Sequence, residues 1–408
     1  MIAIGQKKGI VLILVFMVMV TLTVVVAVFL EMVSIRTKNA GYEISDAKAF
    51  WIAEAGVQKA VYNFKATAGY SANPQSFTES FGGGTYKVLL VLPAPDPQGG
   101  YDFTSTGTFG GMKREVSCNI TGGSVFNYAG FGNSSVTMSN SASTDSYSST
   151  GGQRYNVNGN IGHNGSIGGN ADISMSNSAY IDGNASTGPS GSFSDPKHKY
   201  VYGTVTNTNS VSLPPVTVPS TLTGLASGVA INLSNSDTMT LNSSTSNYKY
   251  STINLSNSAT LTINANTAPV NIYLTGTPSS INISNSAQII IPATNIYPVT
   301  FYTDGGTTIS NGSIVNNSYT PSNLILYDTG AYGVSISNSG DLYGAVYAPS
   351  ASVNMSNSAT IYGSVIAGSL TMSNSATIHY DTALKNVSMS GGTSGYSVKK
   401  WHEVIPAI

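Results

Sequence analysis

The sequence predicts a mainly β protein: a long N-terminal transmembrane helix, a small antiparallel sheet, and a parallel, right-handed β-helix solenoid. Three observations predict this class. An uncharged apolar stretch follows two lysines near the N-terminus, short segments then alternate apolar and polar residues, and the hexapeptide apolar-x-apolar-Ser-Asn-Ser recurs along the rest of the chain. The 43 Gly and the low charged fraction of 9% also fit a turn-rich β protein with an uncharged polar surface.

The charge and cysteine counts exclude several classes of function. The 17 basic and 18 acidic residues give a net charge of -1, so no basic surface is available for nucleic acid. Cys118 is the single cysteine, which excludes an internal disulfide framework and a thiolate metal cluster. We therefore expect partners to be recognised by shape, hydrogen bonds or stacking.

The N-terminal segment is expected to cross a membrane. Residues 10–30 carry no charge and are long enough to span a hydrocarbon core of ~30 Å as a helix. Lys7 and Lys8 precede this segment, so residues 1–8 should stay in the cytoplasm. A cleaved secretory signal is the alternative, but residues 31–36 supply no small-residue cleavage site. We expect a single-pass precursor in the inner (cytoplasmic) membrane whose remainder is exported.

The helical pattern continues beyond the membrane segment. Ile44, Trp51, Ala55 and Tyr62 follow one another at spacings that are typical of one helix face. One helix over residues 10–66 would be on the order of 80 Å long. No globular domain of ordinary size needs such a helix.

These residues resemble a known family. The basic residues, Gly9, the apolar segment and the run Ala-Glu-Ala-Gly-Val at 53–57 are similar to the N-terminal region of PilX-type minor type IV pilins and related pseudopilins. The resemblance implies a leader over 1–9, cleavage after Gly9 by prepilin peptidase, methylation of Ile10, and packing of the helix against other pilin subunits. Leu14 stands where major pilins usually carry Glu, which resembles tip-forming minor subunits. The departure argues against a role as the repeating shaft subunit.

A small head is expected over residues 67–123. Residues 84–92, 101–106 and 112–120 alternate with a period of two and predict three short strands. Cys118 should be a buried structural thiol. Residues 391–408 contain one more alternating segment, 396–404, which is expected to return to the head sheet near residues 85–120; a free tail is the alternative.

The hexapeptide repeat defines the largest domain, residues 124–390. Three long gaps between copies contain degenerate versions at 157–160, 205–209 and 309–312, which bring the period to between about 17 and 29 residues. A period of this size with strand patterns and no helical pattern predicts the β-solenoid. The Asn residues at the centre of the eight copies are Asn140, Asn177, Asn235, Asn257, Asn285, Asn338, Asn357 and Asn374.

These Asn residues are assigned a structural role. Asn tolerates left-handed backbone conformations, and its amide can bond to the same Asn of the next coil as a ladder. A row of ligand-binding amides and hydroxyls is the alternative. Tyr343 and Tyr362, expected to be exposed and one coil apart, are candidates for stacking on sugars, although a Tyr ladder also stabilises sheets without a ligand.

No catalytic constellation is evident, so we expect no enzyme, cofactor or metal. The acidic residues of the repeat domain are scattered, and His163, His198, His379 and His402 have no zinc-binding spacing. A surface-anchored polysaccharide lyase or hydrolase is the alternative, and its mark would be Asp residues converging on Arg154 or Lys249.

The expected function is display of the solenoid on a type IV pilus or a type II secretion-type filament, for adhesion or tip assembly. The implied partners are other pilin subunits, prepilin peptidase, the membrane, and a glycan or other surface ligand, but no nucleic acid. The run Asn-Gly-Asn-Ile at 158–161 also resembles bactofilin-type cytoplasmic scaffolds. The export-oriented helix disfavours that alternative.

Overall fold

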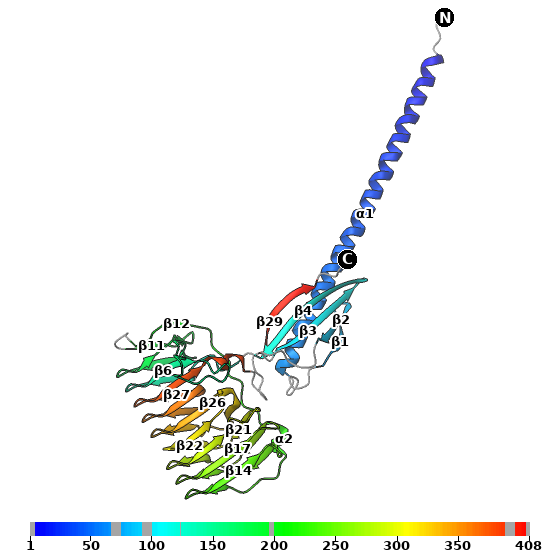
Figure 1. Ribbon diagram of the computed structural model, residues 1–408. Helices are drawn as coiled ribbons and strands as arrows, with labels where there is room; N and C mark the ends of the chain where they lie inside the picture. Colours follow the sequence, from blue (N-terminus) through cyan, green and yellow to red (C-terminus); the bar gives the residue numbers. More distant parts are fainter. Residues whose placement is uncertain are drawn as a thin grey trace.

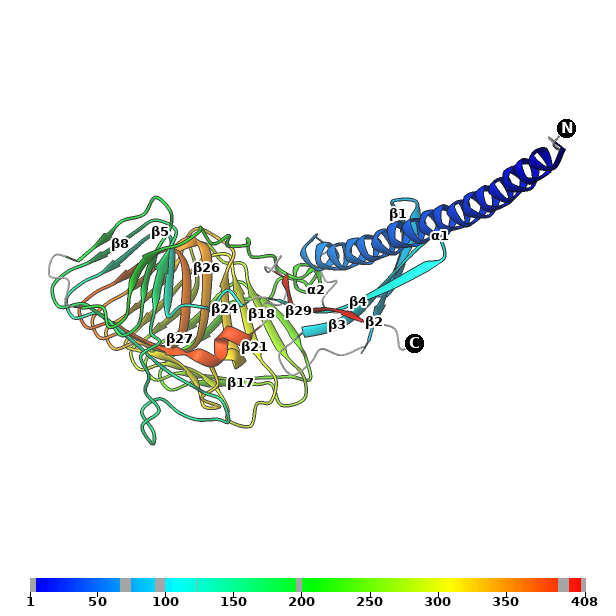
Figure 2. The same ribbon diagram turned by 90° about the horizontal axis from the view of Figure 1, so that it is seen from above.

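The computed structural model describes residues 5–66, 75–91, 100–122, 124–195, 200–387 and 396–404. The protein is mainly β, with a long N-terminal apolar helix, an antiparallel sheet and a large parallel sheet (Figure 1). Seen from above in Figure 2, the helix and the antiparallel sheet lie to one side of the parallel sheet.

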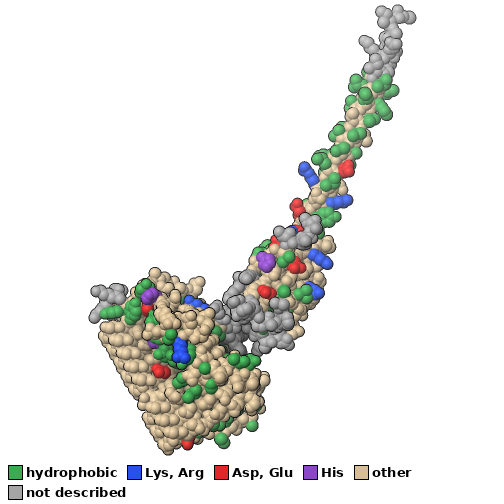
Figure 3. Space-filling model, in the orientation of Figure 1, with side chains coloured by type: hydrophobic (Ala, Val, Ile, Leu, Met, Phe, Trp, Pro, Cys, Tyr) green, Lys and Arg blue, Asp and Glu red, His purple; other side chains and the backbone are tan. Residues whose placement is uncertain are grey.

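Helix α1 (Gly5–Ala66) has 62 residues and two halves of different character. Every residue from Val11 to Ile44 is exposed, whereas Ala53, Val57 and Phe64 are buried. The first half is long and apolar enough to cross a membrane. Apolar side chains cover it along its length in Figure 3.

The second half of α1 packs on a five-stranded antiparallel sheet of order β1-β2-β3-β4-β29. Residues 77–81 form a strand that the sequence did not predict, because Thr78, Glu79 and Ser80 interrupt any apolar alternation. The last strand of the chain pairs antiparallel with β4, and the sequence had placed it near this sheet. The strands are β1 (Phe77–Phe81), β2 (Gly84–Leu90), β3 (Gly100–Phe109), β4 (Met112–Gly122) and β29 (Tyr396–Val404).

The helix and sheet share a separate apolar core. Val57 and Phe64 of α1 pack with Val88, Phe103 and Val116 of the sheet. Cys118 belongs to the same core, and its burial raises the pKa of the thiol to about 12. A thiol in this setting is not ionised near neutral pH and acts as a small apolar side chain.

The parallel sheet contains 24 strands in which each strand pairs with one about three strands further along the chain. Ile231, Ile253 and Ile281 are register neighbours, as are Leu241 and Ile263, so equivalent residues lie over each other and form one continuous buried core. The first strands are β5 (Gly130–Met138), β6 (Ser143–Tyr147), β7 (Ile167–Gly169), β8 (Asp172–Met175), β9 (Tyr180–Ile181), β10 (Ala185–Thr187), β11 (Phe193–Ser194) and β12 (Val205–Asn207).

The remaining strands form an uninterrupted run. They are β13 (Ile231–Leu233), β14 (Thr238–Asn242), β15 (Asn247–Tyr250), β16 (Ile253–Leu255), β17 (Thr260–Asn264), β18 (Val270–Leu274), β19 (Ser279–Ser284), β20 (Gln288–Ile291), β21 (Val299–Thr303), β22 (Gly306–Ser310), β23 (Ser313–Asn316), β24 (Leu324–Asp328), β25 (Val334–Ser337), β26 (Asp341–Met355), β27 (Thr360–Met372) and β28 (Thr377–Asp381). Short helices lie beside them: α2 (Ser220–Thr223), η2 (Pro321–Asn323) and η3 (Thr382–Asn386).

The spatial order of the strands differs from their order in the sequence. β5 pairs with β27 and β6 pairs with β28, so the first strands of the domain continue from its last ones. The chain then crosses from β12 to β13, at the opposite end of the sheet (Figure 1). Bonds along the way hold this crossing: Tyr347 Oη donates to the Pro214 carbonyl at 2.6 Å, and Asn170 bonds both backbone groups of Val211.

Candidate functional site

The Ser-Asn-Ser triplets lie at the corners that follow the strands. In all eight copies the Asn and the Ser after it have positive φ, for example 53° at Asn357 and 60° at Ser358. Few residues other than Gly adopt this conformation, and Asn is several-fold enriched there. The triplet therefore supplies two consecutive left-handed residues at each corner.

The amide side chains at these corners are bonded to one another. Asn374 donates to Asn357 and Asn357 donates to Asn338, each at 3.0 Å. The series continues with Asn140 and Asn177 at one end and with Asn285, Asn257 and Asn235 at the other. Because every donor points the same way, the corner forms a polar column with a direction.

The degenerate copies of the repeat have different positions. Asn311 occupies a corner with φ of 53°, and Ser310 Oγ accepts from Asn338, so this copy fills the gap between Asn285 and Asn338. Asn160 instead bonds the backbone of Ser148. The copy that begins at Val205 pairs with Ala185 in another part of the sheet. Two of the three degenerate copies therefore lie outside the column of bonded corners, although Asn158 and Gly159 of one copy also have positive φ.

A second column is aromatic. Tyr343, Tyr362, His379 and Asp145 are consecutive register neighbours on four strands. The rings of Tyr343 and Tyr362 stack with centroids 3.9 Å apart and 8° between their planes. Both side chains are half-buried, which corrects the expectation that they are exposed. This burial raises the pKa of both hydroxyls.

The segment between β6 and β7 covers part of this column. The Tyr155 ring stacks on His379 at 3.7 Å, and its hydroxyl donates to Asp145 Oδ2 at 2.6 Å. Asp145 Oδ1 lies 2.7 Å from His379 Nδ1. Burial, followed by the bond to Asp145, raises the pKa of Tyr155. The rings of the column are thus in contact with the chain's own side chains.

The four histidines have no zinc-binding spacing, but two of them have specific partners. His163 Nδ1 lies 2.7 Å from Asp182 and its ring stacks on Tyr202, so His163 and His379 each combine a carboxylate with an aromatic ring. The sequence does contain a signal for His379. Tyr343, Tyr362 and His379 directly follow equivalent apolar residues of three strands, so an alignment of these strands would have predicted that His379 lies beside the two tyrosines. His198 lies outside the described residues.

Arg154 and Lys249, the two basic residues that could have marked a catalytic site, contact a ring and backbone carbonyls. Arg154 lies over the Tyr319 ring, 3.6 Å from its centroid, and Tyr319 has φ of 54°. Lys249 Nζ donates to the carbonyls of Thr223 and Leu225. Within the described ranges, no group of three or more His, Cys, Asp or Glu could hold a metal ion.

The junction of α1 with the antiparallel sheet contains the pilin-like motif. Glu54 Oε2 accepts from Trp401 Nε1 of β29 at 2.7 Å. A Cβ atom on Gly56 would lie 2.2 Å from Ser105 Oγ, which itself donates to the Ala53 carbonyl. Gly56 is therefore required for the close approach of helix and sheet.

Ionic contacts join the same elements. Arg114 of β4 donates to Asp46 of α1 from Nε at 2.7 Å and to Glu403 of β29 from Nη1 at 2.9 Å. One guanidinium thus connects the helix, an inner strand and the last strand of the chain.

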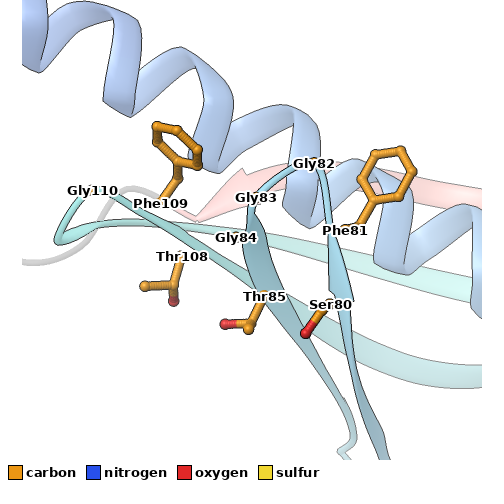
Figure 4. Close-up of a pocket in the computed structure, with 9 residues that line it drawn as sticks. All are labelled: Ser80, Phe81, Gly82, Gly83, Gly84, Thr85, Thr108, Phe109 and Gly110. Carbon is orange, nitrogen blue, oxygen red and sulfur yellow. The ribbon is translucent and has the colours of Figure 1, made fainter.

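An open depression lies between the β1–β2 and β3–β4 turns (Figure 4). Phe81 and Phe109 point to the side of α1, while Ser80, Thr85 and Thr108 point the other way. Its lining contains no acid, base or thiol. Such a surface can make apolar contacts, but its Ser and Thr hydroxyls have no base in the lining that would activate them as nucleophiles.

A family model described as a domain of unknown function (DUF7305) matches residues 218–387, less than half of the chain and close to the run from β13 to β28. A search of the curated proteins found no match. Among solved structures, the chain is similar to the competence-associated pilin ComZ from Thermus thermophilus, at 13% identity and a TM-score of 0.28 over 88% of this chain and 97% of that one.

Proposed function

We propose that the protein is a PilX-type minor pilin or pseudopilin-like subunit of a type IV pilus or type II secretion-type filament. The main support for this proposal is the difference between the two halves of helix α1. Its first half exposes apolar residues throughout, and its second half packs on a sheet that the last strand of the chain completes. Before assembly, the membrane would cover the apolar first half of α1. In the filament, the helices of other subunits would cover it.

The energetics of the exposed half support this assignment. Leu12 is 72% exposed and Phe29 is 66% exposed, and residues 10–30 carry no charge. Burial of apolar surface stabilises by roughly 25 cal/mol per Å². A contiguous exposed surface of this kind marks an interaction site. In the proposed pathway, prepilin peptidase cleaves after Gly9, Ile10 is methylated, and the helix enters the filament.

We further propose that the parallel sheet is a right-handed β-solenoid that is displayed outside the cell for adhesion or tip assembly. The regular pairing of strands three apart, in matching register, supports winding of the chain. In Figure 3 few charged side chains lie on the visible face of this domain. An uncharged polar surface fits recognition of a glycan or another neutral ligand by hydrogen bonds and stacking.

We propose a non-catalytic role for the same domain. Arg154 stacks on Tyr319, and Lys249 bonds two backbone carbonyls, so these described contacts of the two residues involve a ring and carbonyl oxygens instead of carboxylates. Ligand contact at Tyr343 and Tyr362 would require movement of the segment around Tyr155. Polysaccharide panels incubated with the full-length protein should show no shortening of chains.

Mass spectrometry of the exported protein tests the filament assignment. The expected mature chain begins at a methylated Ile10. The variant Gly9→Val should accumulate as uncleaved precursor, and Gly5→Val, which changes another glycine of the leader, should still be processed. A mature chain that starts at Met1, or after residue 30, would remove the assignment.

A binding measurement tests the adhesion role separately. Full-length protein in detergent should bind members of a broad glycan array or host matrix proteins. Complete lack of binding, combined with normal processing at Gly9, would favour tip assembly over adhesion.

A further inference from the structure

The parallel sheet has an unpaired edge at the end that begins with β13. Within the described residues, β13 pairs only with β16, β14 only with β17, and β15 only with β18. In Figure 1, β14 lies at the end of the parallel sheet, on the side of the molecule opposite the N-terminus, with no strand beyond it. Exposed sheet edges are templates for pairing with another chain.

The β14 strand lacks the charged residues and the proline that often protect a sheet edge. Its sequence, Thr-Met-Thr-Leu-Asn at 238–242, contains no charged residue, proline or glycine. Met239 is half-buried, whereas its register neighbour Leu261 on β17 is fully buried. The apolar core is therefore partly open to solvent at this end.

The hydrogen bonds identify which backbone groups are free. The Asp237 carbonyl accepts from Thr260 on the neighbouring strand. Because successive residues of a strand direct their N–H and C=O groups to alternate sides, those of Thr238, Thr240 and Asn242 face the open edge. The Tyr248 hydroxyl already accepts from Asn242 N at 3.2 Å and donates to Asn242 O at 2.8 Å. Thr238 and Thr240 remain without a strand partner.

We propose that this edge binds a second copy of the chain, with the two β14 strands antiparallel about a twofold axis through Met239. Thr238 then lies opposite Thr240 of the second copy, and the free N–H and C=O groups of both residues are paired. The two Met239 side chains meet and cover each other. Asn242 takes no part, so the Tyr248 bonds stay in place.

The sequence of the edge favours a second copy over an unrelated strand. About a twofold axis through Met239 this edge is self-complementary: Thr238 of each copy meets Thr240 of the other, and the two Met239 residues meet each other, as in a contact between identical surfaces. Cross-strand Thr pairs are favourable, and the apolar residue falls between them on the core side. The inference concerns an end of the parallel sheet and does not depend on the proposed filament role.

Disulfide cross-linking tests the register. In an antiparallel pair, residues opposite each other at a non-hydrogen-bonded position have Cα atoms about 4.5 Å apart, within the range of a disulfide. The full-length Met239→Cys protein in detergent should form a reducible dimer under oxidising conditions. Thr262→Cys, half-buried one strand further in, and the wild type with its buried Cys118 should not.

A proline variant separates pairing from folding. The Thr240 N–H points away from β17, so Thr240→Pro removes no bond within the chain but blocks the edge. The double variant Met239→Cys with Thr240→Pro should keep the melting temperature of Met239→Cys and lose the cross-link. A cross-link that survives the proline, or one that Thr262→Cys forms equally well, would overturn the proposal. So would a Met239→Cys protein that stays monomeric or cross-links only to a different protein.

Discussion

At the scale of single residues, the corners of the parallel sheet explain the Ser-Asn-Ser triplet. The sequence predicted a left-handed Asn whose amide bonds to the next one, and Asn357 has both features. It did not predict that the following Ser is left-handed as well. Ser has no strong preference for that conformation, and only the backbone bond from Ser358 N to the Asn374 carbonyl shows why the chain adopts it.

Asn357 should contribute measurably to stability, because it donates to Asn338 and accepts from Asn374. Asn357→Ala loses both bonds and places Ala at positive φ, which together should cost about 2–4 kcal/mol. Asn357→Gly loses only the bonds and should cost roughly half as much. Chemical denaturation followed by circular dichroism would measure this order. Asn354→Ala, at an exposed strand position, is the control, and equal losses for all three would contradict the ladder's role.

A buried carboxylate should make stability depend on pH. Asp328 is 1% exposed, its Oδ1 accepts from Gly330 N, and its Oδ2 has no partner. Burial raises the pKa of this group to about 6. The folded state therefore binds the proton more tightly than the unfolded state, so stability is highest below pH 4 and falls as the pH rises through 6.

Asp328→Asn should remove that loss. We expect the variant to be more stable than the wild type by up to about 3 kcal/mol at pH 7.5 and to have no advantage at pH 4. Thermal melts at the two pH values measure the difference. Asp237→Asn, at an exposed corner, should change stability little at either pH. An equal gain for Asp328→Asn at both pH values would show that charge burial is not the cause.

At the scale of elements, the helix and three antiparallel strands follow from sequence periodicity. The apolar face of α1 had to be buried, Val116 lies between polar residues as in a half-buried strand, and Val88 is buried between exposed neighbours. β1 could not be predicted because it is mostly exposed and lacks that alternation. The role of Gly56 was also out of reach, since its contact with Ser105 joins residues far apart in the sequence.

The packing of α1 on the sheet should be sensitive to one methyl group. Gly56→Ala places a Cβ atom 2.2 Å from Ser105 Oγ and should destabilise the head by about 1–3 kcal/mol. Gly41→Ala on the same helix meets nothing within 4 Å and should stabilise slightly, because Ala favours helices. Hydrogen exchange at the head amides of both variants would test this contrast. Equal protection in the two proteins would show that the helix can shift without cost.

At the scale of the whole molecule, the spatial order of the strands in the parallel sheet could not be read from the sequence. Eight corners have the same triplet and the core columns have similar apolar residues, so many stacking orders satisfy the pattern. Side chains outside the repeat decide the order. Asp145 meets His379, and Tyr380 Oη donates to the Phe126 carbonyl, which joins the first strands of the domain to its last.

Asp381 is the most buried charged residue at this junction, and its loss should open the sheet there. Its Oδ1 and Oδ2 accept from Ser149 N at 2.9 Å and Ser149 Oγ at 2.6 Å, and it also caps η3 through Ala383 N. Asp381→Ala leaves these donors unpaired, at about 1–3 kcal/mol for each buried group. In a stacked array each layer contacts only its neighbours, so the damage should stay local.

We expect Asp381→Ala to lose hydrogen-exchange protection in residues 126–147 while residues 253–291 keep theirs. Asp304→Ala offers the matched control, since Asp304 accepts from Tyr273 Oη within the uninterrupted run of strands. Asp304→Ala should lower the hydrogen-exchange protection of residues near 270–329 and leave the protection of residues 126–147 unchanged. If both variants lost protection everywhere, the strands of the parallel sheet would unfold as one cooperative unit. The stability of the junction would then set the stability of the whole parallel sheet.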